Sequence, residues 1–164
     1  MKQILIYFLA ALFISGCTST PTKTQAELEN VDFTDTDVFD ENILDSMSAN
    51  IQRINVPMIG DVSLNRIPER LGKWLSVVNK EGQLNFKKIY REGDDPRITR
   101  GMPIAILGLL PAVYNFVKDQ LTYNAAILYD ATIFYRPNNG LIEKVVFTKR
   151  KQPVQEGESF RTTD

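Results

Sequence analysis

The side chains that could take part in chemistry are few, and the missing types narrow the choice before any motif is considered. The 164 residues include no histidine and a single cysteine, Cys17. Without histidine there can be no Ser-His-Asp or Cys-His catalysis and no His-ligated zinc site. A pH switch based on imidazole titration is excluded for the same reason. Carboxylate chemistry, a Ser/Lys pair and chemistry at the sulfur of Cys17 remain.

Carboxylates offer the main route to acid–base catalysis. Asp94 and Asp95 are adjacent in a polar loop over residues 91–101, and Glu69 lies in an expected helix. Two neighbouring loop residues rarely point at a common centre, and the glycine and proline on either side of this pair are typical of a turn. We therefore expect a surface loop with mutual ion pairs rather than a catalytic pair.

A second group of acids occupies a short segment without any base: Glu27, Glu29, Asp32, Asp35, Asp37, Asp40, Glu41 and Asp45. Calcium could be bound by four of these acids, namely Asp32, Asp35, Asp37 and Asp40. An EF-hand loop that starts at Asp35 would need glycine at its sixth position and glutamate at its twelfth, where the chain has Asp40 and Ser46. We favour a solvated helix entry, because acids in a first turn complement the helix dipole. No metal site is expected.

The amino terminus has the layout of an export signal. Met1-Lys2-Gln3 carries one positive charge and is followed by an apolar run over residues 4–13. The run is too short to cross a membrane, since a spanning helix needs about 20 apolar residues. A charged start, a short apolar run and small residues are typical of a secretory signal peptide. We expect residues 1–16 to be that signal peptide.

The residues that close the apolar run are Ile14-Ser15-Gly16-Cys17, a branched aliphatic residue, two small residues and cysteine. This segment resembles the lipobox of bacterial lipoproteins, and the resemblance covers only the first seventeen residues. It implies a diacylglycerol thioether on Cys17, cleavage between Gly16 and Cys17, and acylation of the new amino group with a fatty acid such as palmitate. Two or three acyl chains on one residue would anchor the chain firmly. The alternative is a buried structural cysteine at the start of a soluble domain.

The cysteine content agrees with a lipidated, exported chain. One cysteine allows no internal disulfide, and an unprotected thiol would be a liability in an oxidising compartment. In enterobacterial lipoproteins an aspartate directly after the cysteine favours retention in the inner membrane, and here that position is Thr18. By this resemblance we expect a lipoprotein of the cell outer membrane that faces the periplasm.

The remaining chain divides into a tether, one domain and a tail. We expect residues 17–30 to be a lipidated flexible tether, because their Thr/Ser/Pro-rich start lacks apolar periodicity. Residues 31–150 are expected to form the globular domain, and residues 151–164 a disordered tail. The formal net charge of −1 gives no field for nucleic acid, and no basic stripe interleaved with aromatics occurs.

Two amphipathic helices are expected in the first half of the domain. A helix over 37–51 is predicted by apolar residues that recur every four positions, at Phe39, Ile43, Met47 and Ile51. A second helix begins at Pro68, where the missing N–H costs little, and is stopped by Gly82. Its apolar stripe consists of Leu71, Trp74, Leu75 and Val78. We expect Trp74 to lie in the core.

Strands account for the other regular segments. Residues 54–60 form a short extended piece whose Pro57 suits the edge or end of a sheet. Residues 83–90 predict a strand with Leu84 and Phe86 on one face. Residues 125–135 and 141–149, joined by the turn Pro137-Asn138-Asn139-Gly140, predict a C-terminal β-hairpin.

One apolar stretch, residues 102–117, invites comparison with a membrane segment. It is short and contains two prolines and a glycine, which suit a membrane-spanning helix poorly. We expect a buried helix or a broken pair of helices here. An apolar ligand groove lined by this stretch is a lesser alternative.

The predicted fold class is α+β: a single small domain with a mostly antiparallel sheet, helices packed on one face, and a C-terminal β-hairpin. For function we expect a non-catalytic binding, assembly or structural accessory module of the bacterial envelope, with no cofactor and with an envelope protein or an apolar ligand as its partner. Two alternatives stay open. One is an envelope hydrolase that uses carboxylates on cell wall or lipid, and the other is a carrier of an apolar ligand.

Overall fold

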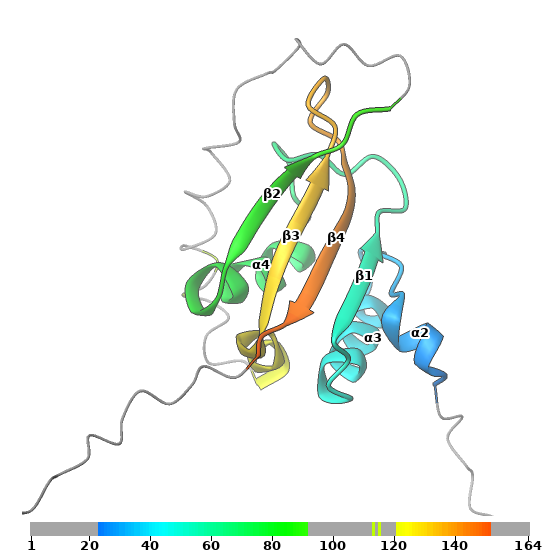
Figure 1. The fold of residues 1–164 in the computed structure, drawn as a ribbon, viewed down its shortest axis with the longest axis vertical. Coiled ribbons are helices and arrows are strands. Elements are labelled where there is room, and N and C mark those ends of the chain that lie inside the picture. The colour runs from blue at the N-terminus through cyan, green and yellow to red at the C-terminus, as the bar shows by residue number, and fades with distance from the viewer. Residues whose placement is uncertain (1–22, 92–112, 114, 116–120, 152–164) are drawn as a thin grey trace, which may run out of the picture.

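The computed structural model describes residues 23–91, 113, 115 and 121–151 (Figure 1). Several predictions lie outside these residues: the lipidated Cys17, the loop that holds Asp94 and Asp95, the tail after Lys151, and most of the 102–117 stretch. Val113 belongs to that stretch and is described. Its side chain is partly buried and packs against the core, which agrees with the expected buried segment at this one position.

Four strands form one open sheet, in the order β1-β4-β3-β2. Their bounds are Arg53–Pro57 for β1, Leu84–Lys88 for β2, Tyr129–Tyr135 for β3 and Ile142–Lys149 for β4. Strand β4 pairs antiparallel with both of its neighbours, whereas β2 runs parallel to β3. The mostly antiparallel sheet and the C-terminal hairpin predicted from the sequence are thus confirmed, and the parallel pair at the β2 edge is an addition.

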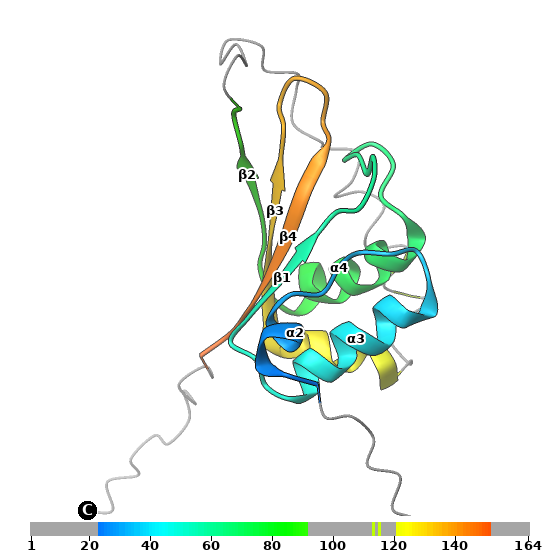
Figure 2. The same cartoon turned by 90° about the vertical axis from the view of Figure 1, so that its right-hand side faces the viewer.

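The helices of the described residues lie on one face of this sheet, as Figure 2 shows from the side. They are α2 (Gln25–Glu29), α3 (Asp37–Ser48), α4 (Glu69–Glu81) and the 3₁₀ helix η2 (Leu121–Leu128). Helices packed on one face were expected, and that part of the fold class is confirmed. The other face carries no helix in the described part of the chain, and it faces the viewer in Figure 1. We call it the open face.

The core lies between the sheet and the helix layer. Alternate residues of β3 point into it, because successive side chains of a strand point to opposite faces: Tyr129, Ala131, Ile133 and Tyr135. The apolar stripe of α3 meets them with Phe39, Ile43 and Met47, all buried. Trp74 of α4 is fully buried, as expected. The apolar side chains that the helical and strand periodicities predicted to be buried therefore pack together in one core.

The amino-terminal part of the described chain is more regular than predicted. Residues 23–30 were expected to belong to the flexible tether, but residues 25–29 form α2. Thr24 and Glu27 close a capping box at its start. Two backbone hydrogen bonds then cover the edge of β1, from Val31 N to Asn55 O at 2.9 Å and from Phe33 N to Pro57 O at 3.0 Å. The prediction of a flexible tether is therefore wrong for residues 23–30. Pro57 does lie at the end of an edge strand, as predicted.

Two local predictions also need correction. Residues 125–128 belong to η2 and not to the hairpin strand, which begins only at Tyr129. Gly82 ends α4 as expected, but not through a left-handed conformation, since its φ is −139°. A Cβ atom at Gly82 would lie 2.7 Å from the carbonyl oxygen of Tyr129. Glycine is required here because the end of the helix approaches the backbone of β3.

No helix in the described segments combines the length and the apolar character that crossing a membrane would require.

Tyr129 joins the sheet to the end of α3. Its side chain is fully buried, and its hydroxyl donates a hydrogen bond to the carbonyl oxygen of Ile51 at 2.9 Å. Burial raises the pKa of Tyr129 from 10.0 to about 12. The folded protein therefore holds the phenol proton more tightly than the unfolded chain does. Sheet stability should depend on that proton.

We predict that Tyr129→Phe lowers the free energy of unfolding at neutral pH by about 1 kcal/mol, the usual net value of one hydrogen bond. The neutral phenol favours the folded state fully below its ordinary pKa of 10.0, and this contribution disappears as pH rises toward about 12. Wild-type stability should therefore fall more steeply than that of the variant over this range. Urea unfolding at a series of pH values measures both slopes. Parallel slopes would contradict the prediction, and Tyr90→Phe, at an exposed side chain, serves as control.

Candidate functional site

Glu69 is the only predicted catalytic carboxylate that the described residues include. Its side chain is 79% exposed and pairs with Lys73 one turn along α4, at 2.9 Å. The hydrogen bond from Lys73 lowers the pKa of Glu69, whereas a general acid needs a pKa raised toward neutrality. The structure therefore gives Glu69 the properties of a surface ion pair. Gly16, Cys17, Asp94 and Asp95 lie outside the described residues.

The acids proposed for calcium are directed at a guanidinium group instead. Arg70 of α4 reaches the start of α3, where Nη2 is 2.7 Å from Oδ1 of Asp37 and Nε is 3.7 Å from Oδ1 of Asp35. A third ion pair joins Nη1 of Arg70 to Asp40. Asp32 takes no part in this cluster and is exposed. The expectation of a solvated helix entry holds for Asp35 and Asp37, but not for Asp40.

Asp40 is the inner member of the cluster, with a side chain only 14% exposed. Its Oδ1 accepts a hydrogen bond from Nε1 of Trp74 at 2.7 Å, while its Oδ2 accepts one from Arg70. The ring of Tyr123 stands edge-on to Trp74, with 4.8 Å between the ring centroids. Burial raises the pKa of Tyr123, and the charge of Asp40 adds to the effect. Two buried aromatic side chains, Trp74 and Tyr123, thus lie beside one paired carboxylate.

The electrostatics of this cluster fit a structural link between α3 and α4. Burial acts to lower the pKa of Arg70, but the charges of Asp40 and Asp37 and their hydrogen bonds outweigh it, so the pKa is raised. Arg70 therefore stays charged at any physiological pH. A permanently charged arginine that is held by three carboxylates offers no proton to a substrate. We assign the cluster to positioning the helices rather than to catalysis.

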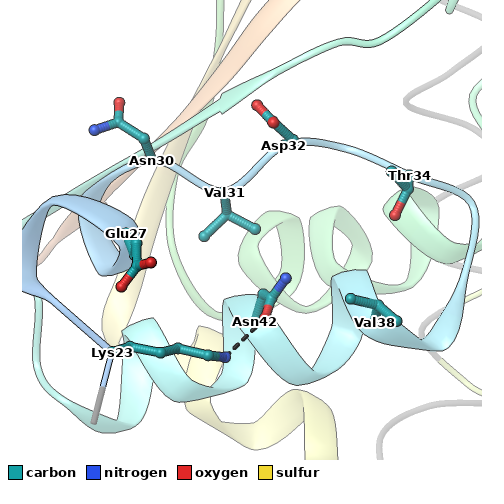
Figure 3. A pocket seen from close by; sticks show the side chains of 8 residues that line it. All are labelled: Lys23, Glu27, Asn30, Val31, Asp32, Thr34, Val38 and Asn42. Carbon is teal, nitrogen blue, oxygen red and sulfur yellow. Dashed lines mark hydrogen bonds between the residues drawn. The ribbon is translucent and has the colours of Figure 1, made fainter. Parts of the chain in front are cut away.

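A first hollow lies between α2, the segment that follows it, and α3 (Figure 3). Its volume is about 290 Å³, and it is lined by Lys23, Glu27, Asn30, Val31, Asp32, Thr34, Val38 and Asn42. Nζ of Lys23 donates to Oδ1 of Asn42 at 2.7 Å and pairs with Asp45. Hydrogen bonds from Thr24 lower the pKa of Glu27 and keep its carboxylate at the cap of α2. Lys23 and Glu27 are thus engaged with neighbouring polar groups, and the lining is mainly polar, which suits a polar surface hollow better than an apolar ligand site.

A second hollow of about 430 Å³ lies between α2 and the turn from α3 into β1. Its lining is also mainly polar: Gln25, Glu29, Ala49, Asn50, Ile51, Gln52, Arg53 and Asn55. Asn50 has a positive φ of 60°, which asparagine tolerates better than most residues. Neither hollow supplies the apolar lining that a carrier of an apolar ligand would need.

The open face presents a different arrangement, centred on Phe134. This side chain alternates with Ile133 and Tyr135 along β3 and therefore points away from the core. The ammonium groups of Lys87 and Lys144, from the two neighbouring strands, lie 5.7 Å and 5.1 Å from the centroid of its ring. Both distances are within reach of a cation–π interaction. An aromatic ring between two bases is the most distinctive feature of the open face.

The acids near Phe134 do not neutralise the positive charge of Lys87 and Lys144. Asp130, the acid on the same face of β3, accepts a hydrogen bond from Gln83 N at 2.8 Å and lies 3.8 Å from Nε of Arg150. Glu143 lies at the irregularity in the register between β3 and β4, and it pairs with Arg136 at 2.5 Å. The acids are thus paired with other bases, and Lys87 and Lys144 leave a local positive charge around Phe134.

Sequence reasoning did not single out this surface. The β3 segment reads Tyr-Asp-Ala-Thr-Ile-Phe-Tyr, so aromatic residues occupy both faces and period-two alternation gives no clear sign of which face is buried. Lys87 and Phe134 meet only through the parallel pairing of β2 with β3, which joins residues far apart in the chain. A correct strand pairing would have been needed to find them.

Comparison with known proteins found no matching protein family, no matching curated protein and no matching solved structure. The assignment of a function therefore depends on the residues themselves.

We predict that Asp40→Ala lowers the free energy of unfolding by about 3 kcal/mol, because it leaves the buried donor of Trp74 and a half-buried arginine without their partner. Asp37→Ala is the matched control. It removes an 89% exposed member of the same cluster, so its effect should stay below about 1 kcal/mol. Trp74 is the only tryptophan, so urea unfolding followed by its fluorescence measures both variants. Equal losses in the two variants would contradict the assigned role of Asp40.

Proposed function

We propose that the chain is a lipid-anchored lipoprotein of the bacterial envelope, held in the outer membrane through Cys17, and that its domain is a non-catalytic module that binds an acidic protein partner on the open face. The anchor is supported by Ile14-Ser15-Gly16-Cys17 and by the signal-like residues before it. Thr18, in the position after the modified cysteine, supports the outer membrane.

The observation that carries the binding role is the placement of Phe134 between Lys87 and Lys144. Aromatic side chains supply large contact area at protein interfaces, and flanking charges select a partner of opposite charge. The ring is partly covered by the two lysine side chains, which can move aside when carboxylates of a partner bind their ammonium groups. An acidic segment that carries an apolar side chain would satisfy both the ring and the bases.

The geometry of the sheet supports the same role. Four strands hold Lys87, Phe134 and Lys144 on a rigid surface, and the residue pairs Lys87–Phe134 and Phe134–Lys144 are directly opposite each other in the ladder. Little conformational freedom of the backbone is then lost when a partner binds. Surfaces that are formed in advance in this way bind with less change of shape.

The anchor leads to a direct prediction. Cys17→Ser should abolish incorporation of a palmitate analogue and should release the chain from the membrane fraction, because no thioether can form. Ser19→Ala, just outside the lipobox, is the matched control and should keep both properties. Metabolic labelling followed by fractionation measures them. Label that persists in Cys17→Ser would disprove the assignment.

The binding surface leads to a second prediction, tested in living cells with a photo-crosslinking residue in place of Thr132 beside Phe134. We expect an adduct whose crosslinked segment, identified by mass spectrometry, is rich in aspartate and glutamate. Phe134→Ser combined with Lys144→Glu should reduce the adduct by at least about tenfold, because the loss of one interface hot spot costs about 2 kcal/mol or more.

The control for this experiment is Lys80→Glu, which changes an exposed base on α4, on the helical side of the sheet. It alters net charge as Lys144→Glu does but should leave the adduct unchanged. Trp74 fluorescence establishes that each variant is folded. An adduct that survives the Phe134 and Lys144 changes, or a partner segment without acids, would disprove binding at the open face.

A further inference from the structure

One end of the domain combines exposed apolar and basic side chains. At this end β1 and β3 begin, β4 ends, and η2 leads from the helix layer into β3, as both views show. We call it the basal end. Three aliphatic side chains of η2 are exposed, with Leu121 at 84%, Ile127 at 38% and Leu128 at 50%. Leu121 is the first residue of η2, whereas Ile127 and Leu128 are adjacent at its last turn and form an exposed apolar pair beside the start of β3.

Basic residues lie at the same end of the domain as Ile127 and Leu128. The backbone N–H of Arg150 donates to the carbonyl oxygen of Leu128 at 2.8 Å, and its guanidinium donates to that of Ile127. Lys149 precedes it and donates from its backbone to Gln52 at 2.9 Å, next to Arg53. Lys151 follows and is exposed. Arg150 thus contacts the end of η2, and Lys149 and Lys151 flank Arg150 in the chain. Arg53 lies at the start of β1, opposite Thr148 of β4.

The charge of these bases is only partly compensated. Nζ of Lys149 is hydrogen-bonded to the neutral amide of Asn50 at 2.7 Å. Asp130 is shared by Arg150 and the backbone of Gln83, and Glu29 lines the same hollow as Arg53. The four bases outnumber these two acids, so an excess of positive charge remains beside Ile127 and Leu128. This is the composition of protein surfaces that lie on anionic lipid bilayers, where aliphatic groups enter the headgroup layer and bases meet phosphates.

The length of the chain before the domain limits how far the basal end can lie from a membrane. This step rests on the proposed anchor at Cys17. Five residues separate Cys17 from Lys23, where the described chain begins, and a fully extended chain of that length spans about 20 Å. Helix α2, which begins two residues after Lys23, lies toward the basal end in both views. Strand β4, with eight residues, is about 27 Å long. The tether is thus shorter than the sheet, so the domain cannot turn over to place the hairpin turn on the bilayer.

We infer that the basal end is a second membrane contact, which docks the domain on the anionic phospholipid surface that holds its lipid anchor. Ile127 and Leu128 enter the headgroup layer, and Arg53, Lys149, Arg150 and Lys151 bind phosphate groups. The partner is the bilayer, because the tether keeps this end beside it.

The test uses the full lipidated chain in vesicles of phosphatidylethanolamine and phosphatidylglycerol. Because the lipid blocks the sulfur of Cys17, Leu128→Cys supplies one free thiol for an environment-sensitive fluorophore. Asn139→Cys, in the exposed hairpin turn at the opposite end, is the matched control. We expect a nitroxide carried on lipid headgroups to quench the label at residue 128 and not the label at residue 139. Adding Arg53→Glu and Lys151→Glu should reduce that quenching by on the order of tenfold, as should vesicles of phosphatidylcholine alone.

The outcomes separate this inference from the anchor itself. Flotation of the chain with the vesicles reports the anchor, whatever the orientation of the domain. If the chain floats and the label at residue 128 is no better quenched than the label at residue 139, the basal contact is disproved and the anchor stands. Quenching that is unaffected by the two charge reversals also disproves the inference. If the chain does not float, the anchor fails, and the inference that rests on it fails as well.

Discussion

The rest of the structure depends on a sheet that the described helices cover on one face only. Tyr129, Ala131, Ile133 and Tyr135 supply the inner row of β3, and burying such side chains contributes on the order of 2 kcal/mol each for the larger ones. The helix layer forms because these residues and the apolar stripes of α3 and α4 can be removed from water only by packing against one another. The same constraint leaves the alternate row of β3 outside, so Phe134 is placed on the open face by the pleat of the strand. The fold and the candidate binding surface therefore have one physical cause.

Within the helix layer, one partly buried carboxylate determines how α3 and α4 meet. Taking a charge out of water is costly, and Asp40 is tolerated because Arg70 and Trp74 both donate to it. Removing either donor leaves the carboxylate underbonded, whereas a shift of one helix along the other would break both hydrogen bonds together. The cluster thus favours a single register between the helices. Its outer acids, Asp35 and Asp37, lie in solvent and add little energy.

Most of the fold could be predicted from local patterns. The burial of Trp74 follows from helical periodicity, and the edge position of Pro57 follows from its missing N–H. The hairpin is indicated by the residues of its turn. The failures have a different origin. The Arg70–Asp40 pair joins residues 30 positions apart. Gly82 is required by the carbonyl oxygen of Tyr129 in β3, which is distant in the sequence. The candidate binding surface needs the parallel pairing of β2 with β3. No local pattern contains such information, because only the packed chain brings these groups together.

The two proposed contacts are geometrically compatible because they lie on different sides of the same sheet. The strands run from the basal end to the hairpin turn, so a domain docked by its basal end would hold its strands away from the bilayer and its open face sideways. A partner would then approach Phe134 along the membrane surface, without competing with lipid for Lys87 or Lys144. Docking would also remove rotational freedom of the domain before the partner arrives, and this lowers the entropic cost of the encounter. A short tether and a basic basal end therefore favour the same function: they present one face of a small sheet in a fixed direction.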